Sequence, residues 1–305
     1  MKQASLPPVS FSRPTRHAVL NSSPSARLPR VLTLAAVLAS VGFFTLSPAR
    51  ADYAVQVVKK GEDGKDGETA FGWSSATAGK DAEAASLNQT TALHNVSTAI
   101  KVGSQGGAGG SVYTKGVFHN VPGKPGGNAG PVSLEVAQSA DLSATLGNAT
   151  LDNPVIQVYS RGGTGGFGYT SWTESDGGIS RGGEAGAVTV TLASTVTASS
   201  TAASHDKSVA AISVLSEGGA AGVSKTGVQG NDGTYKERVD TDRGGSGGKV
   251  SVTLAESSTV TVWGAGAAGV SASSIGGNGG RAINSGGYPS NAGVGGDVDF
   301  TNRGK

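Results

Sequence analysis

The sequence predicts an all-β fold, a parallel β-helix or β-solenoid with repeats of about 56 residues and long Gly-rich loop insertions. Three observations predict it. A phrase consisting of a short strand, a Ser and a run of Gly pairs recurs four times. The segments that follow alternate apolar with polar or small residues at period two, as strands with one buried face do. Gly and β-branched residues dominate elsewhere, which excludes a helical solenoid.

Composition narrows the class of protein. The 305 residues include 50 Gly, 11 Pro and no Cys, and about 5% are aromatic. Gly is more than twice its ordinary share, but it does not recur at every third position, so collagen is excluded. The absence of Cys excludes a disulfide scaffold and thiolate metal sites. Few aromatic residues disfavour a single large globular core.

A secretory signal is predicted ahead of the repeats. Residues 1–30 contain four Arg and no acidic residue, and the apolar run 31–46 follows. The triplet from Ala49 to Ala51 then predicts cleavage before Asp52. A membrane anchor is the alternative, but this run is shorter than the roughly 20 residues that a spanning helix needs. We expect residues 1–51 to be removed on export.

Removal of the signal reverses the net charge. The full chain has 24 basic and 22 acidic residues, a net charge of +2. The signal contains six of the basic residues and no acidic one, so 18 basic and 22 acidic residues remain, a net charge of −4. A mildly acidic exported chain has no general electrostatic attraction to nucleic acid, and we expect no such partner.

The first repeated phrase begins at Ile100, Ile156, Ile212 and Val270, at spacings of 56, 56 and 58 residues, with a weaker copy at Val55. Each complete copy ends in a Gly pair that we expect to form a tight turn at the strand end. These structural turn glycines are Gly106, Gly107, Gly162, Gly163, Gly218, Gly219, Gly276 and Gly277. The residues beyond them are expected to be long loops on one side of the fold.

A second phrase follows each copy of the first and supplies further strands. Period-two alternation predicts strands at 132–136, 188–192 and 250–254, and a third short strand at 142–146 and 260–262. One unit cannot bury its Val and Leu face alone, so successive units must stack strand over strand. Repeat units are expected near 53–97, 98–153, 154–209, 210–267 and 268–305, the last one incomplete.

Two segments resemble phrases of a known family. Residues 269–280, GVSASSIGGNGG, and 295–302, GGDVDFTN, are similar to alternating phrases of Gly-rich autotransporter passenger domains, the type V secretion proteins of Gram-negative bacteria. The resemblance is clear for about 97–305. It implies a β-helical passenger that a C-terminal membrane β-barrel carries to the cell surface.

No segment of this sequence resembles that barrel, since alternating strands of about ten residues with aromatic girdles are missing. The chain stops at Lys305 within the second phrase of a unit, and we expect a passenger truncated before its translocator. The membrane is then reached only through the missing domain. The protein is expected at the cell surface or outside the cell if a translocator exists, and in the periplasm otherwise.

Catalytic, cofactor and metal sites are not expected. His94, His119 and His205 lie in different units at unmatched positions, unlike the ligands of a metal site. Residues 244–248 match G-x-S-x-G, but no helix follows to form a nucleophile elbow. The acidic segment 61–67 lacks the iteration of calcium-binding repeats, and we expect a solvated turn or cap there.

An enzyme of the polysaccharide-active β-helix class is the main alternative. Such enzymes concentrate charged residues on one face of neighbouring units, and Lys101, Glu135 and Lys249 are the candidates here. None recurs at its own phase of the repeat, so we expect no enzyme. The three Trp residues, at 73, 172 and 263, could stack on sugars if exposed, although we expect them to fill corners of the fold.

The sequence therefore predicts an exported, non-catalytic repeat passenger with a structural or adhesive role, whose partner is a host or cell-surface glycan or protein. A non-functional truncated remnant is a further alternative. The sequence leaves the ligand and the oligomeric state open.

Overall fold

The computed structural model describes residues 53–70, 73–96, 98–114, 123–146, 154–168, 180–200, 209–222, 244–263, 267–280 and 291–305. Within these ranges the protein is all-β: its strands form parallel sheets and no helix occurs, which confirms the predicted class. The predicted signal peptide and its cleavage residues, Ala49, Ala51 and Asp52, lie outside the described residues.

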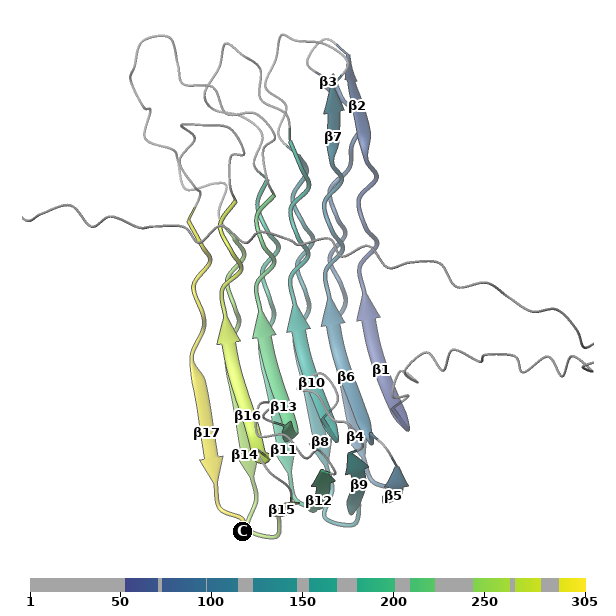
Figure 1. Ribbon diagram of the computed structural model, residues 1–305, viewed down its shortest axis with the longest axis vertical. Helices are drawn as coiled ribbons and strands as arrows, with labels where there is room; N and C mark the ends of the chain where they lie inside the picture. The colour runs from purple at the N-terminus through teal and green to yellow at the C-terminus, as the bar shows by residue number, and fades with distance from the viewer. Residues whose placement is uncertain are drawn as a thin grey trace, which may run out of the picture. The chain divides into compact units, whose positions relative to one another are not determined.

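The first sheet consists of the strands that open each repeat. Its five parallel strands, in the order β1-β6-β10-β13-β16, lie side by side (Figure 1). They are β1 (Val55–Lys60), β6 (Ile100–Gln105), β10 (Ile156–Arg161), β13 (Val209–Glu217) and β16 (Ala267–Ile275). Ile100 pairs with Ile156, Ile156 with Ile212 and Ile212 with Val270, so the alignment of the repeats is confirmed residue by residue.

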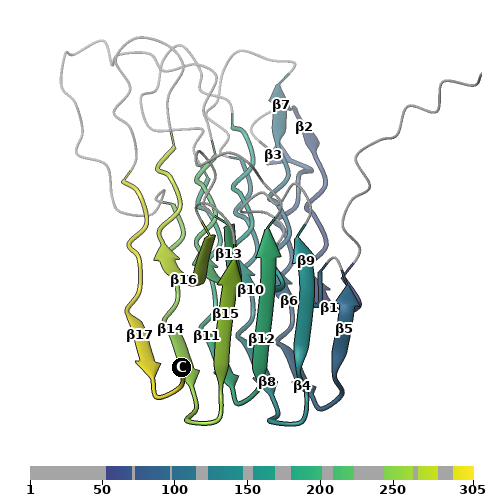
Figure 2. The same ribbon diagram turned by 60° about the horizontal axis from the view of Figure 1, so that its bottom comes forward.

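Two further parallel sheets complete the units. The second sheet has the order β17-β14-β11-β8-β4 and the third has the order β15-β12-β9-β5, which lies in front in Figure 2. The second comprises β4 (Ala85–Gln89), β8 (Val132–Val136), β11 (Val188–Leu192), β14 (Val250–Leu254) and β17 (Val298–Asn302). The third comprises β5 (Leu93–Val96), β9 (Leu142–Leu146), β12 (Thr195–Ser200) and β15 (Thr259–Trp263).

A small sheet of β2 (Gly67–Ala70), β3 (Trp73–Ser74) and β7 (Val112–Thr114) extends the first two units. Strands β8, β11, β14 and β9 have the bounds that the period-two pattern predicts, and β15 contains the predicted 260–262. The pattern succeeds because alternation along a strand depends only on which face is buried.

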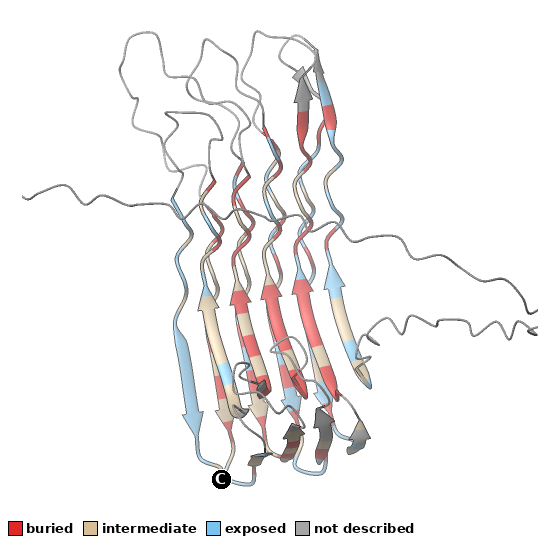
Figure 3. Ribbon diagram, in the orientation of Figure 1, coloured by how far each residue is buried: buried red, intermediate tan, exposed pale blue. Residues whose placement is uncertain are grey.

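One hydrophobic core lies between the three large sheets. Residues of all three contribute to a single cluster, among them Ile156 of the first sheet, Val190 of the second and Val196 of the third, each 1% exposed or less. Figure 3 shows the buried residues gathered in the middle strands, whereas β17 is exposed along its length. Burying each Val, Leu or Ile contributes about 1.5–3 kcal/mol, so stacking drives the fold.

The Gly-rich segments that the structure describes form a second compact part of the fold, whereas most residues of the predicted loops, 115–122, 169–179, 223–243 and 281–290, lie outside the described residues. We call 61–67, 106–112, 162–168, 218–222 and 276–280 the first Gly layer, and 76–84, 123–131, 180–187, 244–249 and 291–297 the second. Neighbouring segments in a layer are joined at every third residue: Gly106 N–H donates to Arg161 O, Gly109 N–H to Thr164 O, and Val112 N–H to Phe167 O.

That three-residue period is the period of a polyproline II helix, which has three residues per turn. None of the eight glycines predicted to form tight turns has φ between +20° and +160°. They continue the chain beyond the strands of the first sheet (Figure 1) and form no turn, so the prediction of tight turns is wrong for these residues. Gly permits both positive φ and close approach of backbones, and at these positions the structure uses the close approach.

Candidate binding surface

Hydrogen bonds between the two Gly layers form one continuous zigzag. Gly127 N–H donates to Gly107 O, Gly163 N–H to Gly127 O, and Gly183 N–H to Gly163 O, each at 2.8 Å. The same pattern continues through Gly219, Gly245, Gly277 and Gly293. Bonds in such a chain polarise one another, which strengthens each of them.

The zigzag explains why these positions are glycine. A Cβ on Gly163 would meet the carbonyl oxygen of Gly107 far inside van der Waals contact, and one on Gly219 would meet that of Gly163 in the same way. Because the obstacle is backbone, no side-chain rearrangement relieves it. Two of the three residues in each period therefore face other backbones, and these two positions are the Gly pair.

A serine in each unit after the first joins the core to the Gly layers. Ser104, Ser160, Ser216 and Ser274 lie in register at the end of the first-sheet strands, and the first three are fully buried. Each hydroxyl donates to one carbonyl of the second layer and accepts an N–H from the next segment. For Ser160 these partners are Gly130 O at 3.0 Å and Gly186 N at 2.8 Å.

The serine row satisfies backbone groups at the junction between strand and Gly layer, where a buried unpaired group would cost about 1–3 kcal/mol. In the first unit Lys59 occupies this position and pairs with Glu83 at 3.3 Å. Sequence reasoning noted the recurring Ser but gave it no role. Its constant place before a Gly pair was the signal that could have identified it.

Side chains leave the Gly layers at every third residue, and we call these the outward positions. In the first layer one row of them is Asp63, Ala108, Thr164, Ala220 and Asn278; in the second, one row is Asp81, Asn128, Glu184, Ser246 and Val294. None of these residues is buried. Both outer faces of the Gly layers therefore present a regular array of mainly small or polar side chains.

Several outward side chains also bridge neighbouring units. Asp81 accepts the N–H of Asn128 at 2.6 Å, and Asn128 accepts that of Glu184 at 2.8 Å. In the first layer Asp63 accepts from Ala108 N at 2.9 Å, and Asp66 accepts from Ser111 N at 2.6 Å. The backbone lattice does not use the N–H at an outward position, so a side-chain oxygen can serve it.

The acidic segment 61–67, expected as a solvated turn or cap, is thus the first member of the first Gly layer, and its acidic side chains are exposed. The N–H of Ala108, with help from Lys60, lowers the pKa of Asp63. A hydrogen bond from Lys80 lowers the pKa of Glu62. Both carboxylates are exposed, so screening by water keeps their contribution to stability small.

A shallow groove of about 290 Å³ runs across the first Gly layer. Its polar lining includes Arg161, Glu217, Thr164 and Asn278, and Ile275 adds an apolar edge. Arg161 Nε lies 3.1 Å from Glu217 Oε2, which places a charged pair from adjacent strands at one end of the groove. Hydroxyl, amide and charged groups side by side can hydrogen-bond a polar ligand.

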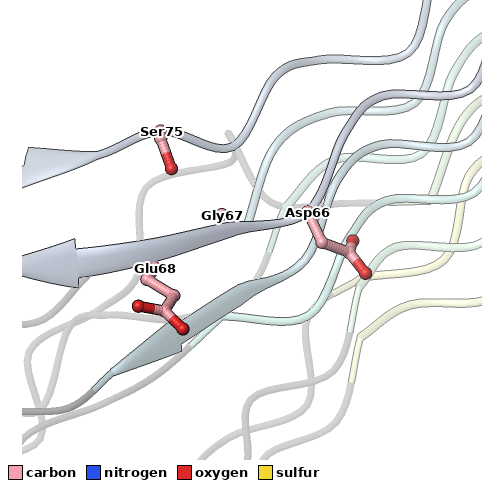
Figure 4. Close-up of a pocket in the computed structure, with 4 residues that line it drawn as sticks. All are labelled: Asp66, Gly67, Glu68 and Ser75. Carbon is pink, nitrogen blue, oxygen red and sulfur yellow. The ribbon is translucent and has the colours of Figure 1, made fainter.

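A second hollow of about 410 Å³ lies in the first unit between Asp66, Gly67, Glu68 and Ser75 (Figure 4). Asp66 already serves the backbone of the next unit. In the part of the chain that the structure describes, no group of three or more His, Asp or Glu residues could hold a metal ion.

The three candidates for a polysaccharide-active site lie apart. Lys101 lies over the rings of Tyr53 and Tyr159, 5.5 Å from each ring centre, on the first sheet. Glu135 is exposed on the second sheet, and Lys249 pairs at 2.5 Å with Asp299, which raises the pKa of Lys249. The three candidates come from different strands: Lys101 from β6, Glu135 from β8, and Lys249 from the residue directly before β14.

The remaining candidates are only partly described. His94 lies 3.3 Å from the hydroxyl of Ser143, on two neighbouring strands of the third sheet. His119, His205, Trp172 and the side chain of Trp73 lie outside the described residues. Trp263, at the end of β15, is 58% exposed, so the prediction that it fills a corner is wrong. Its indole is open to a ligand.

Comparison of the chain with protein-family models, curated proteins and solved structures finds no match in any of the three. Among the described residues, no helix has the length and apolar character required to span a membrane.

Proposed function

We propose that this chain is an exported, non-catalytic repeat passenger of an autotransporter-like protein, with an adhesive or structural role at the cell surface. Its units are the rungs of a parallel β-solenoid that carries the two Gly layers. One observation supports the proposal above all others. The backbone groups of the Gly layers form hydrogen bonds with neighbouring segments, and the side chains at every third residue point outward.

Such an arrangement is suited to presenting side chains to a binding partner. Because each added unit repeats the same backbone contacts, it lengthens the outer faces without changing their geometry. Outward residues can vary freely, as Asp63, Ala108, Thr164 and Asn278 do in one row, while from the second unit onward the glycines between them cannot. A rigid frame with variable side chains is what a surface-binding protein requires.

The chemistry of the surface favours a glycan as the ligand. Thr164 and Asn278 supply hydroxyl and amide groups along the groove, and Trp263 supplies an exposed aromatic face. The hydroxyl groups of a sugar can hydrogen-bond to these polar side chains, and the apolar face of a sugar ring can stack on the indole.

The test is retention of the purified full chain on immobilised glycans, extracellular matrix and whole cells. We expect binding of at least one glycan class, and we expect Trp263→Ala to weaken it about tenfold, or about 1.4 kcal/mol, by removal of the stacking face. Glu135→Ala is the matched control, an exposed strand residue on a different sheet, and should bind like the unaltered chain.

Folded, protease-resistant protein that binds none of these surfaces would contradict adhesion. Release of soluble sugars from plant or bacterial polysaccharides would instead identify the β-helix enzyme. A chain without a cooperative thermal transition would identify the non-functional remnant.

A further inference from the structure

The N–H group at an outward position takes no part in the backbone lattice, so a side-chain oxygen can accept it. At six outward positions the acceptor is the side chain in the same row of the preceding unit. The donors and acceptors are Ala108 and Asp63, Ser111 and Asp66, Phe167 and Ser111, Asn128 and Asp81, Glu184 and Asn128, and Ser246 and Glu184. A carboxylate is the acceptor in four of these six pairs, so an outward N–H is suited to a carboxylate oxygen.

The row of outward positions along the groove departs from this pattern. After Ala108, the N–H groups of Thr164, Ala220 and Asn278 have no acceptor among the described residues. For Asn278 the cause is the residue before it in the row, because Ala220 has a methyl group where Asp63 has a carboxylate. Successive units lie about 4.8 Å apart, so these donors form a short ladder.

The groove gives a ligand access to the end of this ladder. Ala220 and Asn278 both line it, and five glycines complete much of its lining without adding a side chain that would fill it. Arg161 and Glu217 stand at one end of the groove. Arg161 uses its Nε for this ion pair, and its guanidinium has further N–H donors for a ligand.

A carboxylate at the N–H of Asn278 would have the environment that Asp63 already has. The N–H of Ala108 is the largest of the influences that lower the pKa of Asp63, and it therefore favours the charged form of that carboxylate. The N–H of Asn278 occupies the same position in the row three units later. Arg161, 3.1 Å away, offsets the negative charge of Glu217, which reduces its repulsion of an anion.

The backbone around the groove favours a glycan over a peptide as the source of that carboxylate. An extended peptide adds to an exposed edge through N–H and C=O groups that are both unpaired. Here the N–H groups of Gly162, Gly165 and Gly218 are bonded to carbonyl groups of the next unit. The groove therefore offers donors without the alternating acceptors that a peptide backbone needs, whereas sugar oxygens can accept from donors alone.

We propose that the groove binds an acidic glycan, with the carboxylate of one sugar residue above Ala220 as the acceptor for the N–H of Asn278. Arg161 and Thr164 donate to oxygens of neighbouring sugar residues, and the glycan chain runs across the units. Because this site rests on the proposed adhesive function, it adds a ligand class to that function.

The experiment measures binding of short oligogalacturonates to the purified full chain, with their methyl esters as the uncharged counterpart. Ala220→Asn tests the site. Its amide oxygen takes the place that Asn128 has when it accepts the N–H of Glu184, so it occupies the N–H of Asn278 without adding a charge. Ala187→Asn is the matched control, the same change at an exposed outward position of the second layer that does not line the groove.

We expect the unaltered chain to bind the oligogalacturonates at least about tenfold more tightly than the esters, since a charged acceptor strengthens the hydrogen bond. Ala220→Asn should bind them about tenfold more weakly or worse, and Ala187→Asn should bind like the unaltered chain. In nuclear magnetic resonance spectra of the unaltered chain, the amide signal of Asn278 should shift when the oligogalacturonates are added. This second readout does not depend on how a variant folds.

Three results would overturn the site. They are equal affinity for the oligogalacturonates and their esters, full binding by folded Ala220→Asn, and an Asn278 amide signal that does not move. Tighter binding of polyglutamate than of the oligogalacturonates would also overturn it, by identifying an acidic peptide as the occupant. If glycan binding is lost in Trp263→Ala and kept in Ala220→Asn, the adhesive function stands without this groove. If no glycan binds at all, both fail.

Discussion

Each residue of a Gly layer has one of two roles, depending on its place in the three-residue period. Gly107 and Gly163 contact backbone on every side, so only hydrogen fits at their Cα. Thr164, one residue on, lies at an outward position and is exposed. Neighbouring residues thus differ completely in the substitutions they tolerate.

Gly163→Ala should lower the free energy of unfolding by about 2–3 kcal/mol, because its methyl group would displace the backbone at Gly107. Chemical denaturation followed by circular dichroism measures the change. Thr164→Ala, the adjacent outward residue, should stay within about 0.5 kcal/mol of the unaltered chain. Equal stability of the two variants would refute the close packing of the Gly layers.

Elements in this fold differ in how they obtain stability. Strands such as β11 place one face in the hydrophobic core, and their alternation of buried and less buried residues is visible in the sequence. A Gly-layer segment such as 180–187 has little apolar side chain to bury and depends on hydrogen bonds to its neighbours. Pro131 occupies an outward position at which the backbone lattice needs no N–H, which explains why proline is accepted there.

Proline should therefore be tolerated at one phase of the period only. Ala187→Pro, at the position equivalent to Pro131, should leave stability unchanged or raise it by up to about 1 kcal/mol. Ala185→Pro should cost about 2 kcal/mol or more, since the bond from Ala185 N to Ser246 O is lost and the carbonyl stays unpaired. Thermal melts of both variants provide the measurement, and similar melting temperatures would contradict the threefold lattice.

Across the whole of the described structure, the zigzag of bonds links every unit only to its neighbours. Stability in such an arrangement is a sum of unit terms and nearest-neighbour terms, so the ends are the weakest parts. The C-terminal unit illustrates this, because β17 is exposed over all five residues while β14 beside it contains buried Val250 and Val252.

Amide hydrogen exchange should follow this gradient. The amides of Gly163, Gly183 and Gly219 in the middle of the zigzag should exchange at least about tenfold more slowly than those of Gly277 and Gly293 near its end. Exchange resolved by nuclear magnetic resonance gives these rates. Uniform rates along the zigzag would show that the units open as one cooperative body.

The sequence by itself determined the repeat, the all-β class and the strand register. The pairing of Ile100 with Ile156 and of Val132 with Val188 was readable because each unit repeats the same alternation, and identical patterns stack in register. Trp263 was placed wrongly, because a single aromatic residue at a strand end has no periodicity to show which way it faces.

Only the tertiary structure decided what the Gly-rich segments are. A glycine has no side chain whose pattern could distinguish a loop from a packed segment with a three-residue period. Its partners are also distant: Gly163 bonds to Gly127 in the preceding unit and to Gly183 in its own. The role of Ser160 depends on the same distant backbones, Gly130 and Gly186. Hydrogen bonds between such segments exist only after the units have stacked, so the lattice follows from the assembled fold.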